Sequence, residues 1–177
     1  MRCIDTARRR AGTALVAAMV IMLAVAGCMG KDKALQPTET SAQATQRVDK
    51  LWEEAFAQLP SGVNTERNLS LDALSCDAPT DGGPDGRIFV ERRAQVVAPA
   101  SSSWSVTEVL PTFSAFWQRK GYKVITDDHI VNEHRYTVQT GDGYQLMIRT
   151  YDRGDRYDVY VGVNSPCVWE FGTPDPQ

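Results

Sequence analysis

The sequence predicts an α+β domain, a two-layer sandwich in which two helices cover an antiparallel sheet of about five strands tied by one disulfide. Three observations predict this fold. Two segments carry apolar residues at helical spacing. In the C-terminal half, apolar and polar residues alternate along short segments that are separated by tight turns, and two cysteines lie near the ends of the domain. The roughly 135 residues that follow the N-terminal leader are enough for one domain with one core.

The first 27 residues have the pattern of a lipoprotein signal peptide. Four arginines within residues 2–10 precede an uncharged apolar run at 14–26, which is too short for a membrane span of roughly 20 residues. The run ends at residues 25–28 in VAGC, the lipobox pattern of bacterial lipoproteins. We therefore expect cleavage before Cys28 and diacylglycerol on its sulfur. The alternative is an ordinary secretory signal in which this cysteine occurs by chance.

A lipid on Cys28 would decide where the protein resides. Burial of acyl chains gains about 0.8 kcal/mol per CH₂ group, so two or three chains such as palmitate anchor a protein stably. We expect an extracytoplasmic protein held on the cell membrane, with the lipid bilayer as its first partner. Polar residues 28–40 then form a flexible tether, residues 41–172 the domain and 173–177 a short tail.

The charge of the mature part argues against nucleic acid as a partner. The leader takes away four arginines and one aspartate from 19 basic and 22 acidic residues, which leaves a net charge near −6. Nucleic acids and anionic headgroups both require a basic surface.

The cysteines predict one disulfide. Of the four in the chain, Cys3 leaves with the leader and Cys28 carries lipid, so Cys76 and Cys167 remain. In an oxidising compartment an isolated pair of this kind indicates a disulfide. The alternative, two ligands of a metal site, has no Cys-x-x-Cys motif and no histidine pair at ligand spacing to support it.

Residues 41–59 are predicted to form the first helix. One apolar stripe runs along it, and Pro60 and Gly62 stop it; the stripe consists of Val48, Leu51, Trp52, Ala55, Phe56 and Leu59. For Trp52 and Phe56 we favour packing on the sheet over contact with a ligand or membrane.

A second helix is predicted at 106–120. Ser105 and Glu108 have the spacing of a capping box, with Trp104 and Val109 as its hydrophobic staple. Gly121 ends the helix. The buried stripe is expected to contain Val109, Leu110, Phe113, Phe116 and Trp117.

The strands are predicted from alternation. Residues 87–98 form one strand, and residues 68–76 form a short strand or an extended segment. Four more follow at 122–127, 134–140, 143–151 and 156–164. We expect a core of Trp52, Phe56, Phe113, Phe116 and Trp117 against Tyr144, Leu146, Val159 and Val161.

Two acidic segments invite a metal-binding interpretation. Asp77, Asp81 and Asp85 lie in a Gly-rich loop, but their spacing does not match an EF-hand, so a solvated loop is favoured over calcium. Residues 127–129 (Asp-Asp-His) fall between two predicted strands, so we interpret them as a polar turn rather than as part of a metal site.

Several of these features together resemble a family, the small LppA-like lipoproteins of mycobacteria and related actinobacteria. The features are the lipobox at Cys28, the cysteine Cys76 before the first main strand, the Gly121-Tyr122 helix end, residues 135–149 (RYTVQTGDGYQLMIR), and Ser165-Pro166-Cys167 after the last strand. The resemblance covers most of residues 70–170. It implies a secreted, disulfide-tied α+β lipoprotein without an established activity, and it supplies no catalytic residues. The alanine- and arginine-rich leader is also typical of a high-GC actinobacterium.

The sequence offers no catalytic motif. It lacks a nucleophile elbow, a zinc-protease helix, a phosphate loop and a dinucleotide fingerprint, and only His129 and His134 could act as bases at neutral pH. We expect no enzyme, no cofactor and no metal.

Binding is the function that the strand pattern favours. Met147, Arg149, Tyr151 and Tyr160 are expected on the outer sheet face, a composition typical of interfaces; the alternative is that the first helix or water covers this face. The favoured function is a non-enzymatic module of the cell envelope that binds an envelope protein or small ligand. The alternatives are a small enzyme and an accessory subunit of a secretion or wall-synthesis complex.

Overall fold

The computed structural model describes residues 38–76, 86–99 and 103–174. In chain order they form α1 (Ser41–Phe56), β1 (Asn64–Ser75), β2 (Ile88–Val97), the 3₁₀ turn η1 (Val106–Glu108), α2 (Val109–Arg119), β3 (Lys123–Ile130), β4 (Glu133–Gln139), β5 (Gln145–Asp152) and β6 (Tyr157–Asn164). None of the helices in these ranges is long and apolar enough to cross a membrane. Cys28 and the acidic residues Asp77, Asp81 and Asp85 lie outside the described residues.

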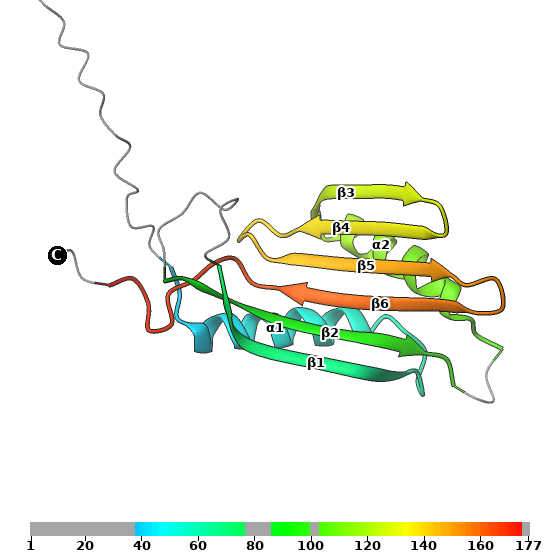
Figure 1. The fold of residues 1–177 in the computed structure, drawn as a ribbon, viewed down its shortest axis with the longest axis horizontal. Helices are drawn as coiled ribbons and strands as arrows, with labels where there is room; N and C mark the ends of the chain where they lie inside the picture. The colour runs from blue at the N-terminus through cyan, green and yellow to red at the C-terminus, as the bar shows by residue number, and fades with distance from the viewer. Residues whose placement is uncertain (1–37, 77–85, 100–102, 175–177) are drawn as a thin grey trace, which may run out of the picture. The chain divides into compact units, whose positions relative to one another are not determined.

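All six strands belong to one antiparallel sheet with the order β1-β2-β6-β5-β4-β3. Both helices lie on the same face of it, α1 behind β2 and β6 and α2 behind β4 (Figure 1). The predicted α+β sandwich with one disulfide is therefore confirmed, except that the sheet has six strands rather than about five.

The additional strand is β1, which the sequence pattern showed only in part. Its pairing with β2 is interrupted twice, between Glu66 and Leu69 and between Leu71 and Leu74. Arg67, in the first interruption, has a φ of +50°. Each bulge shifts the side-chain alternation by one or more positions, which hides the period of two on which strand prediction depends.

α1 begins at a capping box that the sequence analysis missed. The Thr40 side chain accepts a hydrogen bond from the Gln43 N–H, and the Gln43 side chain accepts one from the Thr40 N–H. The helix ends at Phe56, three residues before the predicted end. Its buried face is formed by Ala44, Val48, Leu51 and Ala55.

α2 begins later than predicted, because residues 106–108 form a 3₁₀ turn. The Ser105 hydroxyl caps the turn by accepting a hydrogen bond from the Thr107 N–H. The predicted capping box, which requires reciprocal bonds between Ser105 and Glu108, is not observed. Pro111 fits because N–H groups in the first turn have no helical partner. Gly121, at a φ of +72°, follows the helix end as predicted.

The core lies between the two helices and the inner face of the sheet. Of the residues predicted for it, Phe113, Trp117, Tyr144, Leu146, Val159 and Val161 are buried. Trp52, Phe56 and Phe116 are partly buried and pack at its margin. Trp52 stacks on Phe56 at 4.4 Å between ring centroids, and Phe56 meets Phe113 edge-on at 5.8 Å. These contacts place both aromatic residues of α1 against the core.

The prediction of a polar turn at residues 127–129 is wrong. β3 continues to Ile130, and only Val131 and Asn132 connect it to β4. Asn132 adopts a φ of +62°, a conformation that asparagine tolerates. Because β3 is an edge strand and seven of its eight residues are exposed, polar residues on both faces are compatible with it, and alternation gave no signal.

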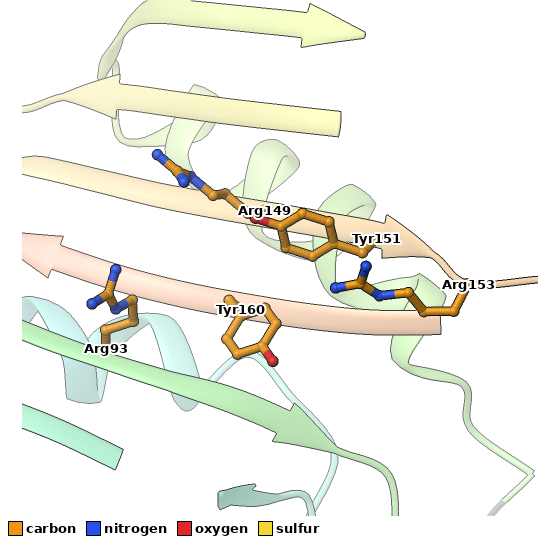
Figure 2. A pocket seen from close by; sticks show the side chains of 5 residues that line it. All are labelled: Arg93, Arg149, Tyr151, Arg153 and Tyr160. Carbon is orange, nitrogen blue, oxygen red and sulfur yellow. The ribbon is translucent and has the colours of Figure 1, made fainter. Parts of the chain in front are cut away.

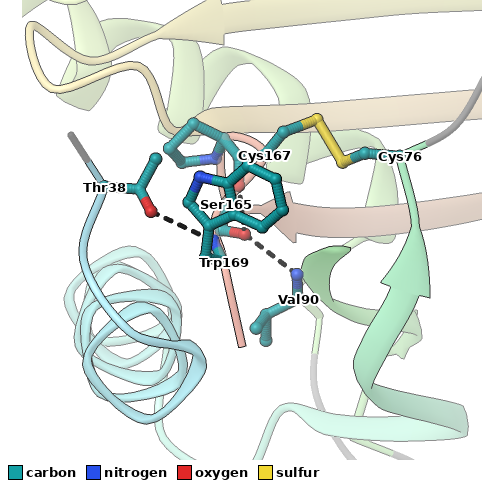
Figure 3. Close-up of a disulfide and its surroundings, with 7 residues drawn as sticks. Thr38, Cys76, Val90, Ser165, Cys167 and Trp169 are labelled. Carbon is teal, nitrogen blue, oxygen red and sulfur yellow. Dashed lines mark hydrogen bonds between the residues drawn. A yellow bond between two sulfur atoms is a disulfide. The ribbon is translucent and has the colours of Figure 1, made fainter. Parts of the chain in front are cut away.

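The predicted disulfide joins the segments that follow β1 and β6. Cys76 and Cys167 are bonded, with 6.0 Å between their Cα atoms (Figure 3). Nearby, the Ser165 hydroxyl accepts a hydrogen bond from the Val90 backbone N–H at 2.9 Å, and the Trp169 backbone N–H donates to the Thr38 hydroxyl at 3.0 Å. The Thr38 N–H in turn donates to the Thr173 hydroxyl. The last residues of the predicted tether therefore contact the start of the predicted tail.

Candidate functional site

The face of the sheet opposite the helices is the candidate site. Arg92 points toward α1 and bonds Asp49 at 2.9 Å, so its neighbours along β2 point the other way. No helix or strand of the described residues covers that outer face (Figure 1). The alternative that the first helix covers it is therefore wrong.

The strand register brings the predicted interaction residues together on this face. Arg149 lies opposite Tyr160, Met147 lies opposite Gly162, and Tyr151 lies diagonally next to Tyr160 across the same strand pair. Met147, Arg149, Tyr151 and Tyr160 thus share one surface of β5 and β6.

These strands carry a hollow of about 350 Å³ that is open to solvent. Its lining consists only of arginine and tyrosine side chains: Arg93, Arg149, Tyr151, Arg153 and Tyr160 (Figure 2). We refer to these five residues as the Arg–Tyr surface. Three of them were predicted from the sequence, whereas Arg93 on β2 and Arg153 after β5 were not.

Neighbouring side chains hold the two tyrosine rings in place. The rings meet edge to face, with 5.9 Å between centroids and 80° between planes. The Arg153 guanidinium lies over the Tyr151 ring at 4.6 Å. The Tyr160 hydroxyl accepts a hydrogen bond from Arg67 at 2.9 Å and donates one to the Gln95 side chain at 3.3 Å. A ligand would therefore meet rings that are already oriented.

The three arginines differ in how their charge is balanced. Arg93 approaches Glu91 at 3.5 Å, and Arg153 pairs with the buried Asp158 at 3.2 Å. The exposed Arg149 has no ion pair or hydrogen bond through its side chain to any described residue. The N–H donors of its guanidinium are therefore available to a ligand.

A like charge lies beside Arg149 in the sheet. Arg135 on β4 is directly opposite it, an arrangement that is normally unfavourable. Arg135 donates a hydrogen bond to Glu133, which lowers the pKa of the Glu133 carboxyl and raises that of Arg135. The Glu133 pKa is also lowered by Coulomb attraction to Arg149 and Arg153, so this carboxylate offsets part of the positive charge around Arg149 without forming an ion pair with it.

The Met147 side chain occupies the space above Gly162 on this face. A Cβ at that position would lie 3.0 Å from Cγ of Met147, closer than ordinary van der Waals contact. The absent side chain leaves room for Met147 over Gly162, which is paired with Met147 on β5 and with Arg93 on β2.

The Arg–Tyr surface has the chemistry of anion binding. Guanidinium groups donate paired hydrogen bonds to carboxylates and phosphates, and tyrosine faces accept rings and aliphatic carbon.

A separate group of side chains could hold a metal ion. Asp127, His129 and His134 lie close together on β3 and β4, on the sheet face that carries Tyr136 and the helices. The expectation that the chain has no metal site was made without this pairing, because the turn between the two strands was predicted too early.

Comparison with protein-family models, with curated proteins and with solved structures found no significant match to this chain.

Proposed function

We propose that this protein is a lipid-anchored, extracytoplasmic binding module whose Arg–Tyr surface recognises an anionic ligand. One observation carries the proposal: the exposed Arg149 guanidinium makes no hydrogen bond or close ion pair with any described residue, and it lies beside two further arginines and two oriented tyrosine rings. The lipobox at Cys28 supports the location.

The charge of the chain makes this surface distinctive. The protein carries a formal net charge of −3, and the predicted mature part is still more acidic. A local concentration of guanidinium groups on such a body attracts anions to one place. It does so without the broad basic surface that nucleic-acid binding requires.

The lining indicates the chemical class of the ligand. The arginines fit a carboxylate or phosphate, and the tyrosine rings fit an adjacent ring or aliphatic segment. A hollow of about 350 Å³ accommodates a small molecule or one acidic side chain with its neighbours. The ligand is therefore a small anion with an apolar part, or an acidic segment of an envelope protein.

The test uses the processed, lipidated chain, isolated from membranes and labelled for NMR. Phenyl phosphate and benzoate serve as probes, and benzyl alcohol serves as the neutral control. We expect saturable shifts at β5 and β6 with the two anions and none with the alcohol. Arg149→Gln should weaken binding by about tenfold or more, because a hydrogen bond to a charged group contributes roughly 1.5 to 3 kcal/mol.

Arg119→Gln provides the matched control. It removes the same charge by the same substitution from an exposed position in the last turn of α2, outside the Arg–Tyr surface. We expect it to leave binding unchanged. Equal weakening by both variants would show that only the overall charge matters, and an absence of saturable shifts on β5 and β6 would refute the proposal.

A further inference from the structure

The chain contains two histidines, and the β3–β4 hairpin places them side by side. His129 on β3 is paired directly with His134 on β4, and Asp127 lies opposite Tyr136, one step along the same face. The turn of two residues and the period of two along each strand therefore bring Asp127, His129 and His134 to one surface.

The distances among these three side chains suit coordination of one metal ion. The Asp127 Oδ1 atom lies 2.7 Å from His134 Nε2 and 3.7 Å from His129 Nε2. The centroids of the two imidazole rings are 3.7 Å apart, with 30° between the ring planes. In a tetrahedral zinc site with bonds of about 2.1 Å, two ligand atoms lie about 3.4 Å apart. The observed oxygen–nitrogen distances lie on either side of this value.

The exposure of the group leaves room for an ion and for its remaining water ligands. The His129 and Asp127 side chains are 72% and 53% exposed, and that of His134 is 19% exposed. The two exposed side chains have room to move by a few tenths of an ångström toward an ion, whereas the less exposed His134 has less freedom.

We propose that Asp127, His129 and His134 bind one divalent transition-metal ion, such as zinc, with water completing its coordination. Two imidazole nitrogens and one carboxylate oxygen suit zinc, copper, nickel or ferrous iron, whereas calcium and magnesium prefer oxygen ligands alone. This site is independent of the Arg–Tyr surface, because it lies on the opposite face of the sheet and shares no residue with it.

The experiment titrates Zn²⁺ into the processed, lipidated chain, isolated without an affinity tag and stripped of metal by a chelator. Competition with a chromophoric chelator measures the affinity. We expect one Zn²⁺ per chain, and each of the variants Asp127→Asn, His129→Ala and His134→Ala should weaken binding by about tenfold or more. Co²⁺ substitution should give the absorption of a site with nitrogen and oxygen ligands.

Asp128→Asn is the matched control. Asp128 is the next residue along β3, so the variant removes the same charge from the opposite face of the same strand. It should bind Zn²⁺ with unchanged affinity, and the variant of the exposed His129 should keep its wild-type circular dichroism spectrum. Three results would each overturn the proposal. They are an absence of saturable Zn²⁺ binding, binding of one Zn²⁺ per chain that persists in both histidine variants, and an equal loss of Zn²⁺ affinity in Asp127→Asn and Asp128→Asn.

Discussion

The indole ring of Trp117 lies parallel to the phenol ring of Tyr136, with 6.2 Å between the ring centroids and 1° between the planes. This pair joins α2 to β4, and both residues are buried. Phe113 continues the contact along the helix at 5.5 Å from Trp117. A fully buried indole, together with Phe113 and Val109, therefore packs the second helix on the sheet.

Trp117→Ala should lower the free energy of unfolding by roughly 3 to 5 kcal/mol, the usual effect of emptying a buried aromatic site. Trp117→Phe should lower it much less, since Trp117 Nε1 is buried without a hydrogen-bond partner in the structure and phenylalanine leaves no such group. Denaturant unfolding measures both values. Similar values for the two variants would contradict the packing described here.

The Cys76–Cys167 bond should contribute about 2 to 5 kcal/mol to the free energy of unfolding, since it closes a loop with a sequence separation of 91. The double variant Cys76→Ser with Cys167→Ser should be destabilised by this amount. Wild-type protein treated with a reductant should unfold at the same denaturant concentration as the variant. A reductant effect on the variant itself would show that another thiol is involved.

The acid sensitivity of the fold should depend in part on Asp142. Burial opposes ionisation of its carboxyl, but hydrogen bonds from Thr140 and Arg47 outweigh burial and lower the pKa of Asp142 below its usual value of 3.8. A lowered pKa stabilises the folded state above the unfolded-state value, and this contribution is lost as pH falls through the folded-state value.

Asp142→Asn should therefore flatten the fall in unfolding free energy between about pH 5 and pH 2. Asparagine keeps the short polar side chain in the β4–β5 turn, so the turn itself should persist. Denaturant unfolding at a series of pH values gives the slope for each protein. Equal slopes in the variant and the wild type would contradict the contribution of the Arg47–Asp142 ion pair.

Cys28→Ala should abolish incorporation of radioactive palmitate and leave the protein either uncleaved or released from the membrane. The reason is that, in the proposed processing, the lipobox cysteine supplies both the acylated sulfur and the new N-terminus. Fractionation and labelling of cells measure the two effects. Labelling that persists in the variant would refute the assignment of the lipid anchor.

Sequence patterns were sufficient where one face of an element is buried. The alternation of Tyr144, Leu146 and Ile148 with Gln145, Met147 and Arg149 predicted β5 and its outer face, because a buried inner face enforces a period of two. β1 and the end of β3 lack that constraint. The first carries bulges near Arg67, and the second is exposed on both faces.

The candidate site was predicted in part for a related reason. Arg149, Tyr151 and Tyr160 follow from alternation within strands that are adjacent in the sequence. Arg93 reaches the same hollow only because β2 inserts beside β6, a long-range pairing that no local pattern contains. The proximity of His129 and His134 likewise depends on a turn placed at Val131 and Asn132, a few residues after its predicted position.

The bonds of Thr38 have a mechanical consequence. A pull along a lipid-held chain would enter the domain at this residue, where bonds to Trp169 and Thr173 and the bridge between Thr40 and Trp169 oppose it. Trp169 lies two residues after Cys167, and Cys167 is bonded covalently to Cys76, which follows β1. A force on Thr38 would therefore be transmitted through Trp169 and the disulfide to the edge strand. Because these bonds precede α1 in the chain, they should oppose a pull from the N-terminal side before it acts on the helix.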